Sequence, residues 1–192
     1  NNILIISHLG PDPDAFCSML LLKEALKQVY PNKNIKVKTK QMPDFSIPTM
    51  KDLEIVERLD QGNEDLIIIT DIPALSICTD KEDSLKDTTV PIMIIDHHPD
   101  GKQSNLDISI NEFRSSATEQ VYVTMKRLFG RKLRITKEMA EIAQYGIVAD
   151  TNRFMYENTT PDTLRIFAEL MGISEIDMEN FCYNSQKFPR ES

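Results

Sequence analysis

Four short apolar runs along the chain have the pattern of buried β-strands. They cover residues 3–7, 35–39, 66–70 and 92–95, and polar or turn-forming residues bound each of them. The run at 35–39 alternates with lysines, which is typical of a strand near the edge of a sheet. Segments with helical periodicity separate these runs, and such alternation predicts parallel strands joined by helices.

The helical segments carry recognisable start and stop signals. In the second half, Ser116 to Glu119 has the sequence of a capping box, and Gly130 closes the helix that follows it. Thr160 is followed by a proline suited to a first helical position. The helices that we expect cover residues 14–29, about 50–59, 117–129, 137–148, 161–171 and 174–183.

Together these elements predict an α/β fold. We expect a parallel, doubly wound sheet of about five strands, with helices on both faces and a helical second half. A length of 192 residues fits one such domain, over residues 1–183, followed by a polar stretch at 184–192 that has the composition of a linker.

Composition narrows the function classes. The hydrophobic content of 41% is enough for an ordinary core, and no apolar run approaches the roughly 20 residues that span a bilayer, so we expect no membrane segment. The net charge of −8 argues against a broad face for duplex nucleic acid, although it leaves room for a small phosphate substrate held through cations. Cys17, Cys78 and Cys182 have no disulfide or metal spacing, which favours reduced thiols and a cytoplasmic location.

All three histidines of the chain follow predicted strands. His8 follows the first, and the run Asp96-His97-His98 follows the fourth. Ligands of an open parallel sheet gather beyond the carboxyl ends of its strands. Further acidic residues share this placement or follow a helix that leads to it: Asp12, Asp14, Asp71 and Asp150.

This set of side chains predicts a metal centre. Carboxylates that converge on one cleft repel one another unless cations lie between them, and a mixed carboxylate and imidazole set suits manganese best, with magnesium or cobalt also suitable. The number of groups suggests two ions that share one bridging carboxylate and activate a water as hydroxide. Singly, each residue has a plainer explanation, such as a helix cap for Asp14 or a turn former for Asp71. Their joint occurrence at one sheet edge is what favours the site.

The same residues carry a resemblance to the DHH phosphoesterases. Asp71 ends a strand as the second motif of that family requires, Asp96-His97-His98 is its third motif, and Asp150, Thr151 and Phe154 fit its fourth. The first motif is matched by His8, Pro11, Asp12, Asp14, Ala15 and Ser18. Two positions depart from the usual pattern, since Pro13 and Asn152 stand where glycine is common. Proline suits the first turn of a helix and asparagine tolerates a left-handed backbone, so neither change removes a ligand.

The resemblance implies a role for each residue. His8 and Asp12 would bind one ion, Asp14, His97 and Asp150 would bind the other, and Asp71 would bridge both. His98 would face the substrate phosphate and act with Asp71 as a catalytic group. Asp96 would fix an imidazole from behind.

Within the family, residues 145–154 and 158–164 resemble the branch of nano-RNases and pAp phosphatases, the bifunctional oligoribonucleases. This implies hydrolysis of short oligonucleotides, of 3′-phosphoadenosine 5′-phosphate, or of both. A family II-like inorganic pyrophosphatase or exopolyphosphatase has the same ligands and stays open, as does a non-catalytic nucleotide- or partner-binding domain. The branch normally carries a C-terminal substrate-binding domain, and we expect residues 184–192 to be the start of the linker to such a domain, which lies outside these 192 residues. A homodimer is compatible with the sequence.

Two arginines are candidates for substrate contact. Arg114 precedes the capping box, where a helix N-terminus could bind an anion, and Arg153 closely follows Asp150. The plainer alternative for each is a solvated surface cation.

Overall fold

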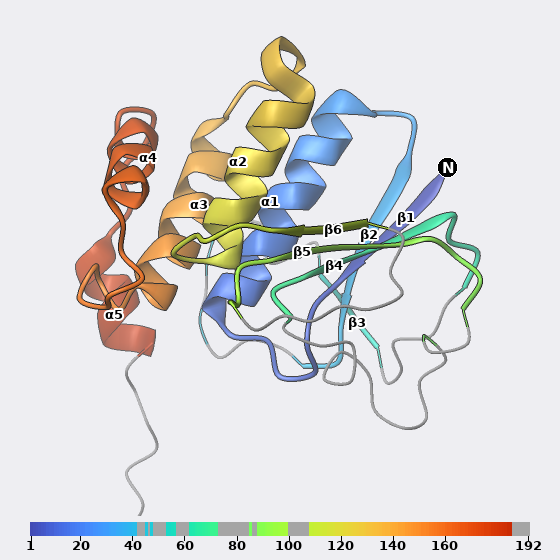
Figure 1. Cartoon of the computed structure of the whole chain (residues 1–192), viewed down its shortest axis with the longest axis horizontal. Coiled ribbons are helices and arrows are strands. Elements are labelled where there is room, and N and C mark those ends of the chain that lie inside the picture. The colour runs from blue at the N-terminus through green and yellow to red at the C-terminus, as the bar shows by residue number, and fades with distance from the viewer. Residues whose placement is uncertain are drawn as a thin grey trace, which may run out of the picture.

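The computed structural model of the chain describes residues 1–41, 45, 47, 53–56, 62–72, 85, 88–99 and 108–185, with side chains up to 181. These residues include a six-stranded sheet in which all paired strands are parallel (Figure 1). The strand order is β3-β2-β1-β4-β5-β6. The strands are β1 (Asn2–Ile6), β2 (Asn34–Thr39), β3 (Glu54–Ile55), β4 (Leu66–Thr70), β5 (Ile92–Asp96) and β6 (Ile108–Asn111).

The register brings the carboxyl ends of the central strands to one edge. Ile6 pairs with Ile69, Thr70 with Ile95, and Asp96 with Asn111. From β1 the chain builds outward to β2 and β3, and it then crosses back to add β4, β5 and β6 on the other side. The switch in direction lies between β1 and β4, which is the place where an open α/β sheet forms its binding crevice.

The helices form a layer over one face of the sheet. They are α1 (Pro13–Val29), α2 (Ala117–Phe129), α3 (Lys137–Asp150), α4 (Pro161–Met171) and α5 (Met178–Ser185). The first three lie side by side, while α4 and α5 contact α3 on the side away from α1 (Figure 1). None of the described helices is long and apolar enough to cross a membrane.

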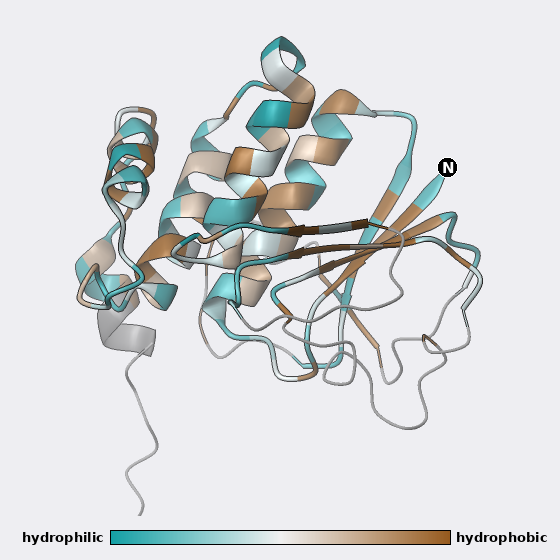
Figure 2. Ribbon diagram, in the orientation of Figure 1, coloured by the Kyte–Doolittle hydropathy of each residue, from teal (hydrophilic) through white to brown (hydrophobic). Residues whose placement is uncertain are grey.

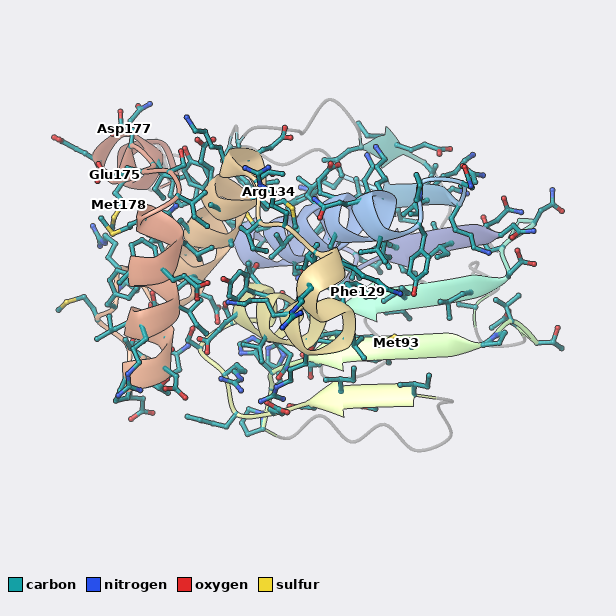
Figure 3. The ribbon with its side chains drawn as sticks, turned by 90° about the horizontal axis from the view of Figure 1, so that it is seen from above. Met93, Phe129, Arg134, Glu175, Asp177 and Met178 are labelled. Atoms are coloured by element: carbon teal, nitrogen blue, oxygen red, sulfur yellow. The ribbon has the colours of Figure 1, made fainter. Side chains whose placement is uncertain are left out.

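Two apolar clusters hold the sheet, one on each face. The larger lies between strands and helices and includes Ile5, Phe16 and Ile147, with Met93 and Phe129 packed against it (Figure 3). Leu4, Ile6 and Ile69 belong to the cluster on the opposite face. Figure 2 shows the central strands as nearly continuous hydrophobic ribbons, as expected for parallel strands that are buried on both faces.

The parallel α/β fold predicted from the sequence is confirmed, and its details need corrections. The sheet has six strands because residues 108–111 form an unforeseen strand and because Glu54–Ile55, inside the helix expected at 50–59, is a strand paired with Lys38–Thr39. The described helices that pack on the sheet all lie on one face. Residues 73–84, which connect β4 toward β5, lie outside the described residues, so helices on the second face are not tested.

The helix boundaries also shift. The helix α1 begins at Pro13, and α3 continues to Asp150. The helix α5 covers Met178–Ser185, so the first residues of the linker expected at 184–192 are helical. The remaining linker residues, 186–192, lie outside the described residues. The capping box is correct in one half only, because the Ser116 side chain accepts a hydrogen bond from the Glu119 amide, whereas the Glu119 carboxylate does not return to Ser116. Cys17 is buried as a free thiol, and Cys78 and the Cys182 side chain lie outside the description.

Candidate metal centre

The predicted ligands meet at the carboxyl edge of the sheet. His8 lies two residues beyond β1, Asp71 directly follows β4, and His97 directly follows β5. At the start of α1, Asp12 is the N-cap, with its Oδ1 atom 3.0 Å from the Ala15 amide nitrogen. The helix can begin there because Pro13 occupies its first position, where no amide hydrogen is needed.

The six predicted ligands form two groups that Asp71 joins. His8, Asp12 and Asp71 offer donor atoms within 4.8 Å of one another, and so do Asp14, His97 and Asp150. The two carboxylate oxygens of Asp71 face different groups: Oδ2 is 3.8 Å from His8 Nε2, and Oδ1 is 3.6 Å from His97 Nε2. The His97 Nε2 atom is also 3.6 Å from Asp150 Oδ2. The placement of Asp71 between the groups is the geometry expected of a bridging carboxylate.

The donor set fits small divalent cations. Ligands at about 2.0–2.2 Å from one ion lie about 3 to 4 Å from one another, which agrees with the separations around Asp71 and His97. Oxygen and nitrogen donors in this mixture suit manganese, magnesium or similar ions. Four aspartates and two histidines can therefore hold two ions, one in each group.

Asp14 is buried, and the first amides of α2 hold its carboxylate in place. Its Oδ2 atom accepts a hydrogen bond from the Ala117 amide at 2.7 Å, and Oδ1 accepts one from the Thr118 amide at 3.0 Å. Burial raises the pKa of Asp14 well above its usual range, and the carboxylates of Asp71 and Asp150 raise it further. A cation beside Asp14 would relieve this repulsion, while the α2 N-terminus already stabilises its charge.

His97 is oriented from its other ring nitrogen. Its Nδ1 atom lies 3.3 Å from the Arg114 carbonyl oxygen, an arrangement in which Nδ1 donates and Nε2 is free to face the carboxylates. Burial alone would lower the pKa of His97, but Asp71, Asp14 and Asp150 together raise it to about 10. The acidic surroundings therefore favour a positive charge at this point, which a bound metal ion would also supply.

His98 is more exposed than its neighbour His97. Its Nδ1 atom lies 2.7 Å from Oδ1 of the fully buried Asp96, which is the support predicted for an imidazole. This hydrogen bond is the main reason that the pKa of His98 is raised. Asn111, which the sequence pattern did not single out, donates to the His98 carbonyl oxygen at 2.8 Å. The sequence pattern did not predict the strand β6, which carries Asn111, and so it did not predict this hydrogen bond to His98.

The two predicted arginines are placed differently. The Arg114 guanidinium is largely buried and pairs with Glu112 at 2.8 Å and Glu119 at 3.4 Å. The anion site expected at the start of α2 is occupied by the protein itself, because Asp14 takes two of the helix's free amides and Ser116 takes a third. Arg153 is exposed, and its guanidinium contacts Asn152 Oδ1 at 3.3 Å. Substrate contact by either arginine stays a prediction.

Left-handed backbone surrounds the ligands. Asp71 has a φ angle of 58°, and Asn152, Arg153 and Phe154 follow Asp150 with φ angles of 44°, 60° and 66°. The tolerance of Asn152 for this conformation was anticipated, whereas the run of three residues was not. Such conformations each cost of order 1 kcal/mol or more, and they persist where surrounding contacts hold them. Here the Thr151 hydroxyl accepts from the Phe154 amide at 3.1 Å and donates to the Ile147 carbonyl.

Removing the Asp150 charge is expected to stabilise the metal-free protein. Burial raises the pKa of Asp150 to about 6, with a further contribution from Asp71. Because this folded-state value exceeds the usual 3.8, ionisation of Asp150 lowers stability as pH rises through the interval from about 4 to 6. In chelator-treated protein at pH 7, Asp150→Asn should raise the free energy of unfolding by about 1–3 kcal/mol in urea titrations.

The same variant should lose most of the stabilisation that added divalent cations give the unsubstituted protein. Glu157→Gln, which changes an exposed carboxylate, is the control and should leave both quantities unchanged. If metal-free Asp150→Asn were less stable than the unsubstituted protein, burial and neighbouring carboxylates would not destabilise the ionised Asp150 side chain.

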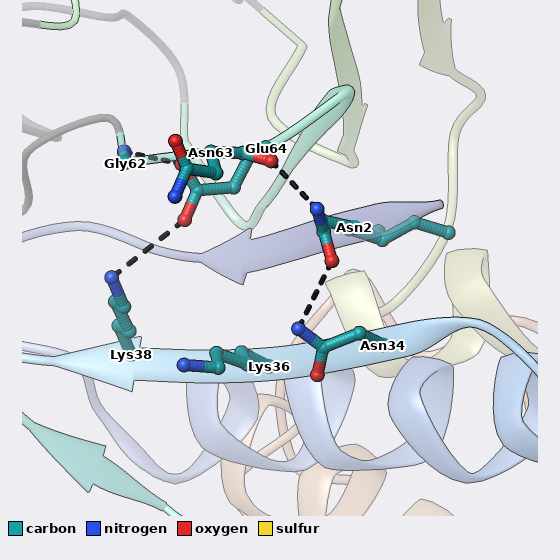
Figure 4. A pocket seen from close by; sticks show the side chains of 8 residues that line it. Asn2, Asn34, Lys36, Lys38, Gly62, Asn63 and Glu64 are labelled. Atoms are coloured by element: carbon teal, nitrogen blue, oxygen red, sulfur yellow. Dashed lines mark hydrogen bonds and ion pairs between the residues drawn. The ribbon is translucent and has the colours of Figure 1, made fainter.

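A polar hollow of about 280 Å³ lies away from these residues, between β1, β2 and the segment that precedes β4 (Figure 4). Its polar groups largely pair with one another, as in the contacts of Lys38 with Glu64 at 3.8 Å and of Asn34 with Asn2 at 3.1 Å. It contains none of the predicted ligands. The chemistry suggested by the sequence therefore lies at the opposite edge of the sheet.

Comparison with known proteins finds similar sequences over most of the chain. Residues 2–147 match the family described as the DHH family, N-terminal domain. A curated relative from Bacillus subtilis, named bifunctional oligoribonuclease and PAP phosphatase NrnA, is 30% identical over 175 residues, which cover 89% of this chain and 53% of the relative. A relative from Streptococcus mutans, named probable bifunctional oligoribonuclease and PAP phosphatase NrnA, is 29% identical over 190 residues. This match covers 98% of this chain and 58% of the relative. The chain thus spans about half the length of these relatives.

Two solved structures share the fold. An exopolyphosphatase-related protein from Bacteroides fragilis has a TM-score of 0.80 and 25% identity, covering 99% of this chain and 57% of that protein. A putative family II inorganic pyrophosphatase from Methanococcus jannaschii has a TM-score of 0.67 and 21% identity, covering 95% and 60%. At that lower identity the second likeness concerns the fold alone.

Proposed function

This chain belongs to the DHH family, and we propose that it is a two-metal phosphoesterase that hydrolyses short oligonucleotides, 3′-phosphoadenosine 5′-phosphate, or both. The observation that carries the proposal is the position of Asp71, whose two oxygens face two separate groups of ligands. A single structural ion would need only one of these groups.

The ligand roles follow from the two groups. His8 and Asp12 would hold one ion, Asp14, His97 and Asp150 would hold the other, and Asp71 would contact both. When bound, two such ions lower the pKa of a coordinated water and offset charge on the phosphate oxygens. Manganese is our proposed metal because the donor set mixes hard carboxylates with imidazoles.

His98 would contact the substrate phosphate. Asp96 accepts from the Nδ1 atom of His98 and raises its pKa, and in the protonated ring Nε2 is the nitrogen left to donate a hydrogen bond toward a phosphate oxygen. His98 is the least buried of the three site residues His97, His98 and Asp71, as a substrate-facing group should be. The role of Asp96 would be to fix the direction of that hydrogen bond.

The substrate class is proposed from the relatives. The relatives from Bacillus subtilis and Streptococcus mutans, which are 30% and 29% identical over 89% and 98% of this chain, carry the oligoribonuclease and PAP phosphatase name. The three cysteines have no disulfide or metal-binding spacing, which suggests a cytoplasmic location. Such a location agrees with a nucleotide substrate.

Parallel assays test the substrate class. With manganese present, we expect turnover of a ribodinucleotide and of 3′-phosphoadenosine 5′-phosphate, each with a kcat/KM at least about tenfold above that for inorganic pyrophosphate. The measurement is phosphate or nucleoside monophosphate release under matched metal concentrations. Efficient turnover of pyrophosphate alone would replace this proposal by the pyrophosphatase alternative.

A further inference from the structure

Glu119 is a fully buried carboxylate that the proposed chemistry does not use. It lies in the first turn of α2 and reaches back along the chain. Its Oε2 atom accepts hydrogen bonds from the Ser115 amide at 3.2 Å, from the Ser115 hydroxyl at 2.5 Å and from the Thr163 hydroxyl at 2.8 Å. One oxygen atom therefore joins the loop before α2 to the start of α4.

The loop fixed by Glu119 and the first turn of α2 contact two members of one ligand group directly. The Arg114 carbonyl oxygen faces Nδ1 of His97, and the Ala117 and Thr118 amides bind the carboxylate of Asp14. All three contacts come from residues within three positions of Ser115. The position of the loop thus sets the orientation of two ligands directly.

The third ligand is reached through one side chain. The Asn158 Nδ2 atom donates to the Ser115 carbonyl oxygen at 2.8 Å and lies 3.3 Å from the Asp150 carbonyl oxygen. Asn158 therefore ties the segment after Asp150 to the residue that Glu119 holds. The group of Asp14, His97 and Asp150 is anchored as a unit.

The other ligand group is not anchored in this way. In the described part of the chain, no hydrogen bond of residues 114–119 reaches His8, Asp12 or Asp71. Asp12 is instead fixed by its own helix, through the Ala15 amide. A change at Glu119 should therefore affect the two metal positions unequally.

We propose that Glu119 is a positioning residue for one metal position, that of Asp14, His97 and Asp150, and not for the position of His8 and Asp12. The inference rests on the proposed two-metal centre. Without the carboxylate, the buried Ser115 amide and the hydroxyls of Ser115 and Thr163 lose their acceptor, and the loop must move to satisfy them. Groups behind metal ligands typically contribute about 10- to 100-fold to metal affinity.

The test is calorimetric titration of metal-free protein with Mn²⁺, in which we expect two binding steps, one for each metal position. The variant Asp12→Asn weakens one of them and so identifies the step of the His8 and Asp12 position. We expect Glu119→Leu to weaken the other step by about 10- to 100-fold and to leave the His8 and Asp12 step within about threefold. Glu119→Gln should restore part of the affinity, because an amide oxygen can accept the same three hydrogen bonds, although its NH₂ group cannot replace the Oε1 contact with Arg114 at 3.4 Å. Recovery by glutamine is not expected if the residue acts through its charge.

Two further variants keep the test decisive if Glu119→Leu folds poorly. Ser115→Ala removes only the 2.5 Å hydrogen bond and should weaken the same step by about 3- to 10-fold. Thr124→Val is the matched control, since Thr124 is buried on α2 but accepts only from Gln120, away from the ligands. It should lower thermal stability without changing either binding step.

The outcomes separate the two claims. If the unsubstituted protein binds no Mn²⁺, the proposed function fails. If it binds two ions and the Glu119 and Ser115 variants weaken both steps equally, or neither step, the positioning role is overturned while the metal centre stands.

Discussion

Asp71→Asn is expected to lower kcat/KM for the nucleotide substrate by about 10³-fold or more and to abolish binding of a metal pair. Asp71 offers one oxygen to each ligand group, so an amide in its place removes the shared negative charge and turns an NH₂ group, which cannot bind a cation, toward one of the two groups. Asparagine is the right replacement because it tolerates the left-handed backbone of this position, where φ is 58°. Steady-state kinetics and metal analysis on the same samples measure both effects.

The same substitution separates an enzyme from a binding domain. A non-catalytic nucleotide-binding domain would show no turnover before the change and unaltered nucleotide binding after it. Asp162→Asn, an exposed carboxylate in the first turn of α4, serves as the control and should retain full activity. Retention of more than a tenth of the activity by Asp71→Asn would rule out a bridging role.

Gly146→Ala is expected to destabilise the fold by about 3 kcal/mol or more, which lowers Tm by about 6–12 °C for a chain of this size. A methyl group at Gly146 would press against the Thr118 hydroxyl and would lie 2.7 Å from Thr118 Cβ and 2.9 Å from Cys17 Cβ. These contacts involve three helices, since Cys17 lies on α1, Thr118 on α2 and Gly146 on α3. Since Thr118 binds Asp14 and α3 ends at Asp150, metal affinity should fall as well.

A second substitution tests the steric reason. Thr118→Ala added to Gly146→Ala removes the hydroxyl and should recover part of the stability, but not all, because the contact with Cys17 remains. Gly172→Ala is the matched control, with no atom closer than 3.3 Å to an added Cβ, and its Tm should change by no more than a few degrees. An unchanged Tm for Gly146→Ala would mean that the helices separate at little cost.

The central strands were predictable because local pattern and tertiary environment agree there. Residues 66–70 form a run buried on both faces, and the strand β4 matches the predicted bounds. By contrast, β3 has only two residues, both exposed, and β6 has four with little burial, so neither produces a strong apolar signal. Their pairing depends on neighbouring strands, which a local pattern does not contain.

The convergence of the candidate ligands was predictable for a related reason. Residues that directly follow strands of a parallel sheet meet at one edge, so His8, Asp71 and His97 could be placed from position alone. The supports could not be placed in this way. Glu119 looked like half of a capping box, and its true partners include Thr163, which is 44 positions away. The left-handed run after Asp150 likewise depends on the Thr151 side chain and not on glycine.

Titration of the metal-free protein with Mn²⁺, followed by electron paramagnetic resonance, tests the two-ion centre most directly. Two ions that share Asp71 would lie about 3.5–4 Å apart and would be magnetically coupled. The account predicts that, at two ions per chain, the six-line signal of isolated Mn²⁺ is replaced by the broad spectrum of a coupled pair. A well-folded protein that binds no ion, only one ion, or two uncoupled ions would contradict it.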